Sequence, residues 1–493
     1  MKRKRSMIAL LAAVVLLAGL YVYLANRPQN NEQADKQPII EISQLDLEKV
    51  IRLTLRNENT PEELVFEKHT REVEEQEEPG SDENEQPQIE TFWVNAKPYE
   101  VELAQSKVTD LARSFSSLNA DMLVEEQPQD LSIYGLDQPV ATGTAQLEDG
   151  TRVTLHLGNK TAAGSTWYLM KEGDPRVFTV ANHHGQRLSS SWSEFRSKDL
   201  PEIDTMNLTY MHLSAEGRKD IEIRMNENLL DEELTFGVNL YSLTKPYKRY
   251  KGANSRKLGE MLESLAGLKI REFVEDHPED YSQYGLDQPK LHFVVKDETT
   301  TLDLSFGHSL DDGTIYFKTG DSDGVYLMEE TAMAFLDVEP FELSDKFALM
   351  VNIDDVDRIT LEGRGRRHTM RIIRTTVEPE EEGEEEEEVE TYFLDEKQVE
   401  EDPFKKFYQR LIGIVVDAEK EHTAAGGTPE LKITYHLNKG KQRNATLELY
   451  PYDADFYSLV LDGDMESEFL VYRKQPEWVF ETLDDLIAGR MDE

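Results

Sequence analysis

The sequence contains no cysteine among its 493 residues. Without thiols the chain has no disulfide, no thiolate metal ligand, no cysteine nucleophile and no lipid-modified cysteine anchor. Basic residues are scarce beside acidic ones, because 54 Lys and Arg face 98 Asp and Glu and the formal charge is -44. A nucleic-acid-binding protein needs the opposite sign of charge, so the composition argues against nucleic acid as a partner.

The short motifs that mark common active sites are missing as well. The chain has no Gly-x-Ser-x-Gly elbow, no phosphate loop ending in Gly-Lys-Ser/Thr and no His-Glu-x-x-His. A His pair, a Ser-x-x-Lys pattern and a truncated calcium-loop pattern are weak partial matches, at residues 183–184, 242–245 and 321–324. The sequence therefore predicts no catalytic residue, no metal site and no cofactor, and a hydrolase built on a buried carboxylate pair stays open as an alternative.

The longest apolar run lies at the N-terminus. Lys2, Arg3, Lys4 and Arg5 precede 19 uncharged residues, 7–25, which as a helix span about 28 Å, close to the bilayer core. Basic flanks stay cytoplasmic, which places the rest of the chain outside. We predict a single-pass signal-anchor in the cell membrane. A cleaved signal peptide is the alternative, although the run is longer than a typical signal core.

A six-residue sequence, Tyr-Gly-Leu-Asp-Gln-Pro, occurs twice, at residues 134–139 and 284–289. Identity in one register indicates an internal repeat. Gly permits a left-handed turn, Asp can bond a nearby backbone amide, and Pro starts a strand without donating to its ladder. We predict a structural connector, and a ligand-gripping loop is the alternative. The connector residues are Tyr134, Gly135, Leu136, Asp137 and Pro139 in the first copy and Tyr284, Gly285, Leu286, Asp287 and Pro289 in the second.

Apolar residues ahead of each hexapeptide recur at i, i+3, i+4 and i+7, the spacing of a helix with one buried face. The series start at Val108 and Leu258, and a third starts at Phe404. Alternating strands precede each series, and hairpins follow it. We predict an α+β fold of three tandem repeats, each a mostly antiparallel sheet packed by helices, behind the transmembrane helix. The predicted bounds are 1–25 for the basic tip and anchor, 26–44 for a polar linker, and 45–202, 203–352 and 353–493 for the repeats, the third divergent.

Two acidic tracts, at residues 72–90 and 378–390, fall at one position in the first and third copies, in the loop that joins the first two predicted strands. The second copy has a shorter loop there, at about 226–233. Such runs bury too little apolar surface to order, so we expect solvated loop extensions. Weak binding of cations or of an envelope polymer by these loops is an alternative function.

These features resemble domain-of-unknown-function family 4340, which comprises uncharacterised bacterial membrane-anchored envelope proteins. The resemblance rests on the anchor, the hexapeptide, and the hairpin ends Leu-His-Leu-Gly at 155–158 and Leu-Ser-Phe-Gly at 304–307. It is weaker in the third copy, where Ala-Ala-Gly-Gly-Thr-Pro at 424–429 replaces the hexapeptide. The family is similar in part to auxiliary subunits of gliding-type ABC exporters, so the resemblance implies a transporter partner. It supplies no catalytic residue.

The sequence thus predicts a non-enzymatic, single-span membrane protein. Its acidic extracytoplasmic repeats are expected to bind or scaffold partners, as an accessory of an ABC-type export system or of other envelope proteins.

Overall fold

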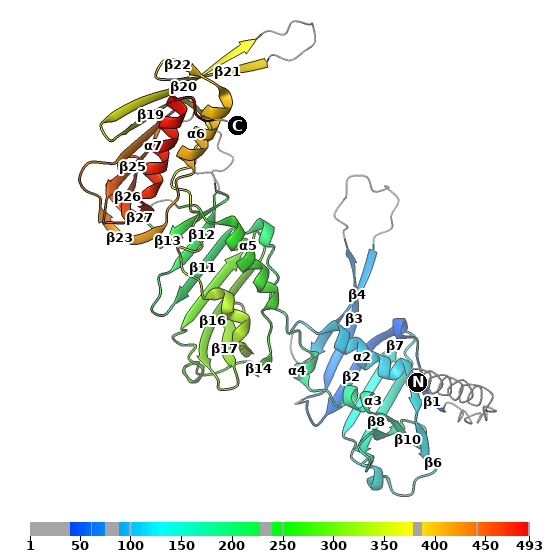
Figure 1. The fold of residues 1–493 in the computed structure, drawn as a ribbon. Helices are drawn as coiled ribbons and strands as arrows, with labels where there is room; N and C mark the ends of the chain where they lie inside the picture. The colour runs from blue at the N-terminus through cyan, green and yellow to red at the C-terminus, as the bar shows by residue number, and fades with distance from the viewer. Residues whose placement is uncertain are drawn as a thin grey trace, which may run out of the picture. The chain divides into compact units, whose positions relative to one another are not determined.

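The computed structural model describes residues 40–60, 62–73, 88–97, 101–226, 239–248, 251–377, 387–439 and 442–491. Contacts divide the chain into two units, one ending at Ser197 and one beginning at Lys198. The first unit holds an eight-stranded sheet and a two-stranded sheet, and the second holds an eight-stranded and a nine-stranded sheet (Figure 1). Neighbouring strands in these sheets are antiparallel.

The first repeat has an incoming strand, three sheet strands, a helix that crosses the sheet, and further strands that end in two short helices. Its elements are β1 (Ile40–Gln44), β2 (Val50–Asn57), β3 (Leu64–Val73), β4 (Gln88–Lys97), α2 (Gln105–Ser116), β5 (Ser117–Ala120), β6 (Met122–Glu125), β7 (Ala141–Leu147), β8 (Arg152–Lys160), β9 (Thr166–Lys171), β10 (Val177–Ala181), α3 (Asn182–Leu188) and α4 (Trp192–Phe195). The sheet order is β4-β3-β2-β7-β8-β9-β10-β6, and β1 pairs with β5. Helix α2 therefore carries the chain from one sheet edge towards the other.

The second repeat has the same order of elements with a shorter helix. Its elements are β11 (Tyr210–Ala215), β12 (Ile221–Met225), β13 (Tyr241–Lys245), α5 (Ser255–Glu263), β14 (Glu272–Glu275), β15 (Leu291–Lys296), β16 (Thr301–Ser309), β17 (Thr314–Thr319), β18 (Val325–Glu329) and a closing 3₁₀ helix (Glu330–Leu336). The sheet order is β13-β12-β11-β15-β16-β17-β18-β14, which matches the first sheet strand for strand.

The third repeat adds one edge strand and ends in a longer helix. Its elements are β19 (Val356–Gly363), β20 (Arg366–Val377), β21 (Glu387–Leu394), β22 (Lys397–Val399), α6 (Glu401–Ile412), β23 (Ala418–Ala424), β24 (Leu431–Leu437), β25 (Asn444–Pro451), β26 (Phe456–Leu461), β27 (Glu466–Tyr472) and α7 (Lys474–Ile487). The order β22-β21-β20-β19-β24-β25-β26-β27-β23 repeats that of the other two sheets, with β22 added outside β21.

The predicted tandem repeats of a mostly antiparallel sheet are confirmed, but the predicted α+β class is wrong in its balance. The described residues form many strands and few helices, so the fold is more β than α+β. The helical stripes are present: α2 buries Val108, Leu111, Ala112 and Phe115 against the sheet. One apolar face on each crossing helix is what covers one face of each sheet.

Three features of the chain order differ from expectation. Residues 40–44, predicted to belong to the linker, form β1, because Ile42 is buried in the first core. A strand in each repeat, β3, β12 or β20, was not predicted, so the acidic tracts join the second and third strands rather than the first two. The short strands β6 and β14 separate each crossing helix from its hexapeptide.

The described ranges contain no helix that is long and apolar enough to cross a membrane. The predicted span, residues 7–25, lies outside those ranges, as do most residues of both acidic tracts.

Candidate functional site

The hexapeptide turn of the first repeat leads from β6 into β7. A 3₁₀ turn (Leu131–Tyr134) ends at Gly135, whose φ of 67° lies in the left-handed region that glycine adopts without strain. The Tyr134 ring meets Tyr168 edge-on, with centroids 5.0 Å apart, and its hydroxyl donates to Glu125 Oε2 at 2.7 Å. That hydrogen bond to a carboxylate, together with burial, raises the pKa of Tyr134.

The second repeat reproduces this geometry. Gly285 has a φ of 70°, the Tyr284 and Tyr316 rings are 5.0 Å apart, and the Tyr284 hydroxyl donates to Glu275 Oε2 at 2.6 Å. The bond to Glu275 raises the pKa of Tyr284 to about 12. Leu286 is buried in the small apolar cluster under the turn, as Leu136 is in the first repeat.

A glycine in the following hairpin makes room for each turn. A Cβ on Gly158 would lie 2.2 Å from the Tyr134 carbonyl oxygen, and one on Gly307 would lie 2.0 Å from that of Tyr284. The Leu-His-Leu-Gly and Leu-Ser-Phe-Gly hairpin ends are thus the partners of the hexapeptides. In the third repeat the pairing of Leu431 with Leu449 puts the buried Tyr450 at the position of these glycines. No hexapeptide turn needs the space there.

The Asp and Pro of the hexapeptides face solvent. Asp137, Asp287 and Pro289 are exposed, and Pro139 is half-buried. Neither Asp carboxylate has a hydrogen-bond partner among the residues that the structure describes. The predicted bond from these carboxylates to a nearby backbone amide is therefore not formed.

Two other aspartates make that bond. Oδ1 of Asp130 accepts from the Ser132 N–H at 3.0 Å, and Oδ1 of Asp280 accepts from the Ser282 N–H at 2.8 Å. Hydrogen bonds from the two Ser residues lower the pKa of both aspartates. The Asp-x-Ser pattern recurs at the same distance ahead of each hexapeptide and was visible in the sequence. The pattern was not among the repeated features from which the connector was predicted.

The partial motifs remain structural in this fold. The rings of His183 and His184 lie 4.0 Å apart at the start of α3, and burial lowers the pKa of His184 to about 4. Ser242 is buried on β13, whereas Lys245 at its end lies 3.6 Å from Glu222. Among the described residues, no three His, Asp or Glu side chains are grouped to hold a metal ion.

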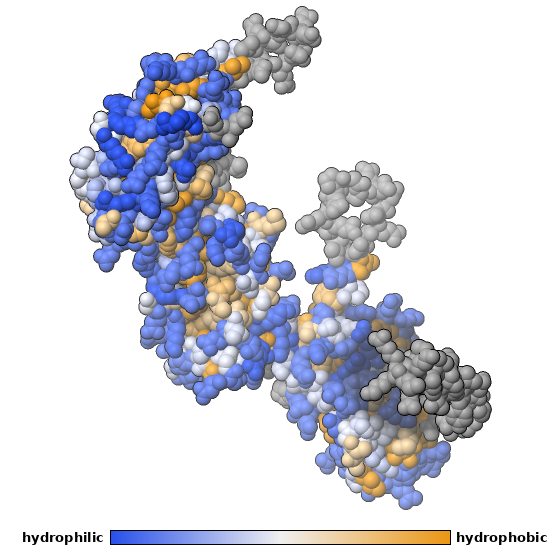
Figure 2. Space-filling view, in the orientation of Figure 1, coloured by the Kyte–Doolittle hydropathy of each residue, from blue (hydrophilic) through white to orange (hydrophobic). Residues whose placement is uncertain are grey.

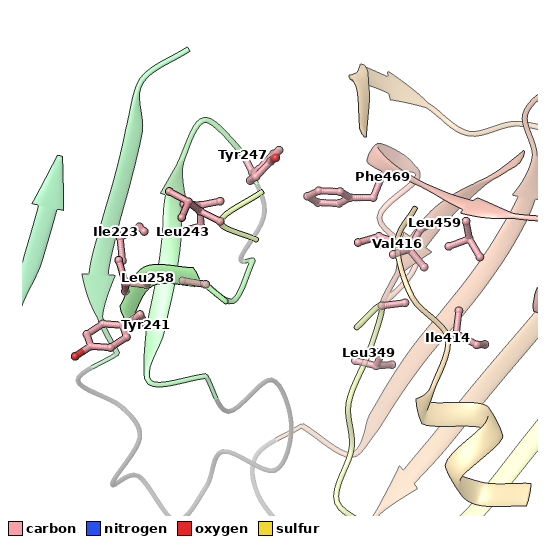
Figure 3. Close-up of a cluster of buried hydrophobic side chains, with 14 of the residues drawn as sticks. Ile223, Tyr241, Leu243, Tyr247, Leu258, Leu349, Ile414, Val416, Leu459 and Phe469 are labelled. Atoms are coloured by element: carbon pink, nitrogen blue, oxygen red, sulfur yellow. The ribbon is translucent and has the colours of Figure 1, made fainter. Parts of the chain in front are cut away.

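The second and third repeats meet inside the second unit, and this contact shows how a repeat edge binds polypeptide. The Tyr247 ring, which follows β13, packs on Phe469 with centroids 4.8 Å apart (Figure 3). Its hydroxyl donates to Glu419 Oε2 at 2.6 Å, and Lys219 Nζ donates to Glu419 Oε1 at 2.9 Å. Burial raises the pKa of Tyr247. The junction thus combines an aromatic pair with a charged network.

Two lysines lie beside this junction, Lys251 buried and Lys346 half-buried. Lys251 Nζ donates to the Phe347 carbonyl at 3.0 Å and lies over the Phe469 ring. Burial lowers the pKa of Lys251 to about 8 and that of Lys346 also to about 8. Backbone bonds from Ala348 N–H to the Ile414 carbonyl and from Val416 N–H to the Lys346 carbonyl then join residues 346–348 to the segment between α6 and β23.

The three residues ahead of each crossing helix, which we call the pre-helix segment, carry a second contact. In the first repeat, residues 102–104 pair antiparallel with residues 195–197, which we call the outgoing segment. The Ala104 N–H donates to the Phe195 carbonyl at 2.9 Å, and the Ser197 N–H donates to the Glu102 carbonyl at 2.8 Å. The outgoing segment is the last stretch of a repeat before the chain continues.

The second repeat makes the same two bonds. The pre-helix segment 252–254 bridges the outgoing segment 343–345, with Asn254 N–H on the Leu343 carbonyl at 2.8 Å and Asp345 N–H on the Gly252 carbonyl at 2.7 Å. Leu343 is buried, as Phe195 is in the first repeat.

The pre-helix segment of the third repeat, 398–400, has no such partner. In the third repeat Phe393 on β21 pairs with Gln398. In the second repeat Ser242 on β13 pairs with Gly252, so the pre-helix segment has the same register on the neighbouring strand in both repeats. In an antiparallel ladder, that register turns the Gln398 carbonyl and the Glu400 N–H away from β21. Within the described part of the chain, neither group has a hydrogen-bond partner.

A groove of about 480 Å³ lies beside this open segment. Its polar lining includes Lys397, Gln398 and Glu400, and the end of α7 contributes to its apolar lining. The surface seen in Figure 2 is largely hydrophilic, with apolar side chains in patches. The apolar residues that line the groove are Leu394, Val399, Leu486, Ile487 and Met491.

A known protein family matches much of the chain. The family described as "Domain of unknown function (DUF4340)" matches residues 93–250 and 242–411, which together cover more than half of the chain. The chain belongs to the DUF4340 family. No curated protein and no solved structure matches it.

Each DUF4340 match begins in the third strand of one repeat and ends beyond the first strands of the next. Each therefore contains one hexapeptide turn with its glycine and one outgoing segment; the first contains one crossing helix, α2, and the second contains α5 and most of α6. The open segment 398–400 falls within the second match, whereas β23 to α7 follow it. The DUF4340 description names no activity, so the predicted exporter partner stays a prediction.

Proposed function

We propose that this protein is a single-span membrane protein whose extracytoplasmic DUF4340 repeats bind another envelope protein, in the service of an ABC-type export assembly. The observation that carries the proposal is the edge of the sheet at the crossing helix. In the second repeat this edge already binds polypeptide, both the outgoing segment and the third repeat. In the third repeat the equivalent pre-helix edge is open and lies beside an apolar groove.

The buried charges support binding rather than catalysis. Glu448 is buried and accepts from Lys432 at 2.6 Å and from Tyr450 at 2.6 Å, so its lone pairs are used by the fold. Asp355 is buried and lies 2.5 Å from Lys439 Nζ. An acid or base that is neutralised in this way is poorly placed to exchange protons with a substrate.

Retrieval from crosslinked membranes tests the proposal. The full chain, tagged after residue 493, is crosslinked in its native membrane and purified, and the co-purifying proteins are compared with those from an untagged strain. We expect enrichment of a membrane-embedded ABC subunit. Repeated recovery of no envelope protein above the untagged background would contradict the proposal.

The absence of cysteine makes the membrane topology easy to check. Single substitutions Ser6→Cys and Thr428→Cys give one thiol on each side of the predicted span. A membrane-impermeant maleimide should label the exposed position 428 in intact cells and position 6 only after permeabilisation. Labelling of position 6 in intact cells would refute the predicted orientation.

A further inference from the structure

The third repeat lacks a contact that the first two repeats make with their own chain. In those repeats a short extended segment closes the pre-helix edge through two backbone hydrogen bonds and one buried apolar side chain, Phe195 or Leu343. In the third repeat the described residues after the closing helix α7 make no such pairing, and residues 398–400 keep their outward carbonyl and N–H unpaired within the described residues.

We propose that the groove beside residues 398–400 binds an extended segment of another polypeptide, which adds to the sheet as the outgoing segments do. This inference rests on the proposed function, because it names the surface and the chemistry by which the partner is held. Strand addition supplies affinity through backbone bonds and selectivity through the side chains that enter pockets.

The two internal examples define the segment that fits. Both outgoing segments place an apolar residue first, two polar residues next and a lysine fourth: Phe-Arg-Ser-Lys at 195–198 and Leu-Ser-Asp-Lys at 343–346. The carbonyl of the first residue of the outgoing segment accepts from the N–H of the third pre-helix residue. The N–H of the third residue of the outgoing segment donates to the carbonyl of the first pre-helix residue. The partner segment is therefore expected to carry an apolar anchor followed at the third position beyond it by a basic residue.

The groove provides complementary surfaces for both ends of such a segment. Val399, together with Leu486 and Ile487 at the end of α7, forms an apolar surface on which the anchor can pack. The Ile487 side chain is 50% exposed. Glu400 lines the same groove and offers its carboxylate to a basic residue, whereas the Asp395 carboxylate is already bonded to His368 and to the Thr369 N–H. The acidic balance of the whole chain disfavours a second copy as the occupant, because two copies with a formal charge of -44 repel one another.

Glu400 allows the backbone bond to be removed without breaking the fold. Its φ of -69° is the value that proline requires, and as the residue ahead of α6 it donates no bond within the helix. Glu400→Pro therefore deletes the outward N–H and the side-chain charge together. Glu400→Ala deletes the charge alone and serves as the matched control.

The test uses the purified full chain in detergent and a fluorescent peptide with the sequence of residues 341–347. Fluorescence anisotropy should show saturable binding to the native chain and to Glu400→Ala. Binding to Glu400→Pro should be weaker than binding to Glu400→Ala by about tenfold, the effect of one backbone hydrogen bond. The same peptide with Leu343→Asp should not bind.

Two results would overturn the inference: no saturable binding to the native chain, or equal binding to the Glu400→Ala and Glu400→Pro chains with both folded by circular dichroism. A dimer of the full chain that the peptide dissociates would assign the groove to a second copy and also overturn it. If the peptide fails to bind while membrane crosslinking still retrieves an ABC subunit, the proposed function stands and another surface carries it.

Discussion

Gly307 lies where β16 passes the carbonyl oxygen of Tyr284, and this single contact explains why the hexapeptide and the hairpin glycine recur together in two repeats of this chain. The left-handed turn at Gly285 brings the Tyr284 carbonyl onto the strand, and only a residue without Cβ leaves room for it. The same pair, Gly158 and the Tyr134 carbonyl, recurs in the first repeat. The hexapeptide is therefore a turn that packs on the glycine of the following hairpin. Its predicted role as a connector stays a prediction.

Gly307→Ala should destabilise the second repeat by about 1–3 kcal/mol, because its Cβ overlaps a backbone oxygen that cannot move alone. Gly259→Ala is the matched control, since a Cβ there meets nothing within 4 Å and its site in α5 favours Ala over Gly. Chemical unfolding of both variants measures the difference. A Gly307→Ala chain as stable as Gly259→Ala would show that the contact is relaxed at no cost.

His184 should make the first unit sensitive to mild acid. Burial lowers its pKa in the folded state to about 4, whereas the unfolded chain keeps the ordinary value of 6.5. The unfolded state therefore binds a proton first as pH falls, so stability present above pH 6.5 is lost between pH 6.5 and about 4, by at most about 3 kcal/mol. His184→Asn should flatten this part of the pH profile measured by hydrogen exchange in the first unit, and the exposed His183→Asn should not. An unchanged slope in His184→Asn would contradict the assignment.

At the scale of elements, the crossing helices were predictable and several strands were not. Apolar side chains at i, i+3, i+4 and i+7 identify α2, α5 and α6, because each of these helices buries a single face. The strand β20 was not predicted because its arginines, at 366, 367, 371 and 374, fall at irregular spacing among the apolar residues and hide the alternation of a strand. The strands β6 and β14 escaped because four residues are too few for a period.

The open pre-helix segment could not be predicted from the sequence at all. Its significance depends on backbone bonds between segments far apart in the chain, 102–104 with 195–197 and 252–254 with 343–345, and the two pre-helix segments, Glu-Leu-Ala and Gly-Ala-Asn, share no residue in register. Backbone pairing leaves no side-chain signature, so only the fold shows that the third repeat lacks it. The glycine positions, by contrast, were visible as the ends of two hairpins.

Tyr247 should couple the second and third repeats. Tyr247→Ala removes the ring contact with Phe469 and the bond to Glu419, at a cost of about 3–5 kcal/mol for a buried aromatic side chain. Hydrogen exchange should then accelerate at the Val416 amide, which bonds the Lys346 carbonyl. Tyr316→Ala removes an aromatic ring from the far side of the second sheet and should leave that amide unchanged. Equal protection at Val416 in both variants would mean that Tyr247 does not hold the junction.

At the scale of the whole molecule, one topology occurs three times and differs mainly at its edges. The first two repeats close the pre-helix edge with their own chain, and the second also holds the third repeat through Tyr247. The third repeat exposes that edge beside a groove. In a repeat array each unit contacts its neighbours through equivalent surfaces, so an open equivalent surface is the natural place for a partner.

Site-specific photo-crosslinking in the native membrane tests this account most directly. A photoreactive residue replaces Ile487, which is 50% exposed in the groove, or Met206, which is 86% exposed in the second repeat and serves as the control. The account predicts a discrete adduct with one envelope protein at position 487 and none at 206. It is contradicted if position 487 gives no adduct, or if both positions give the same adducts.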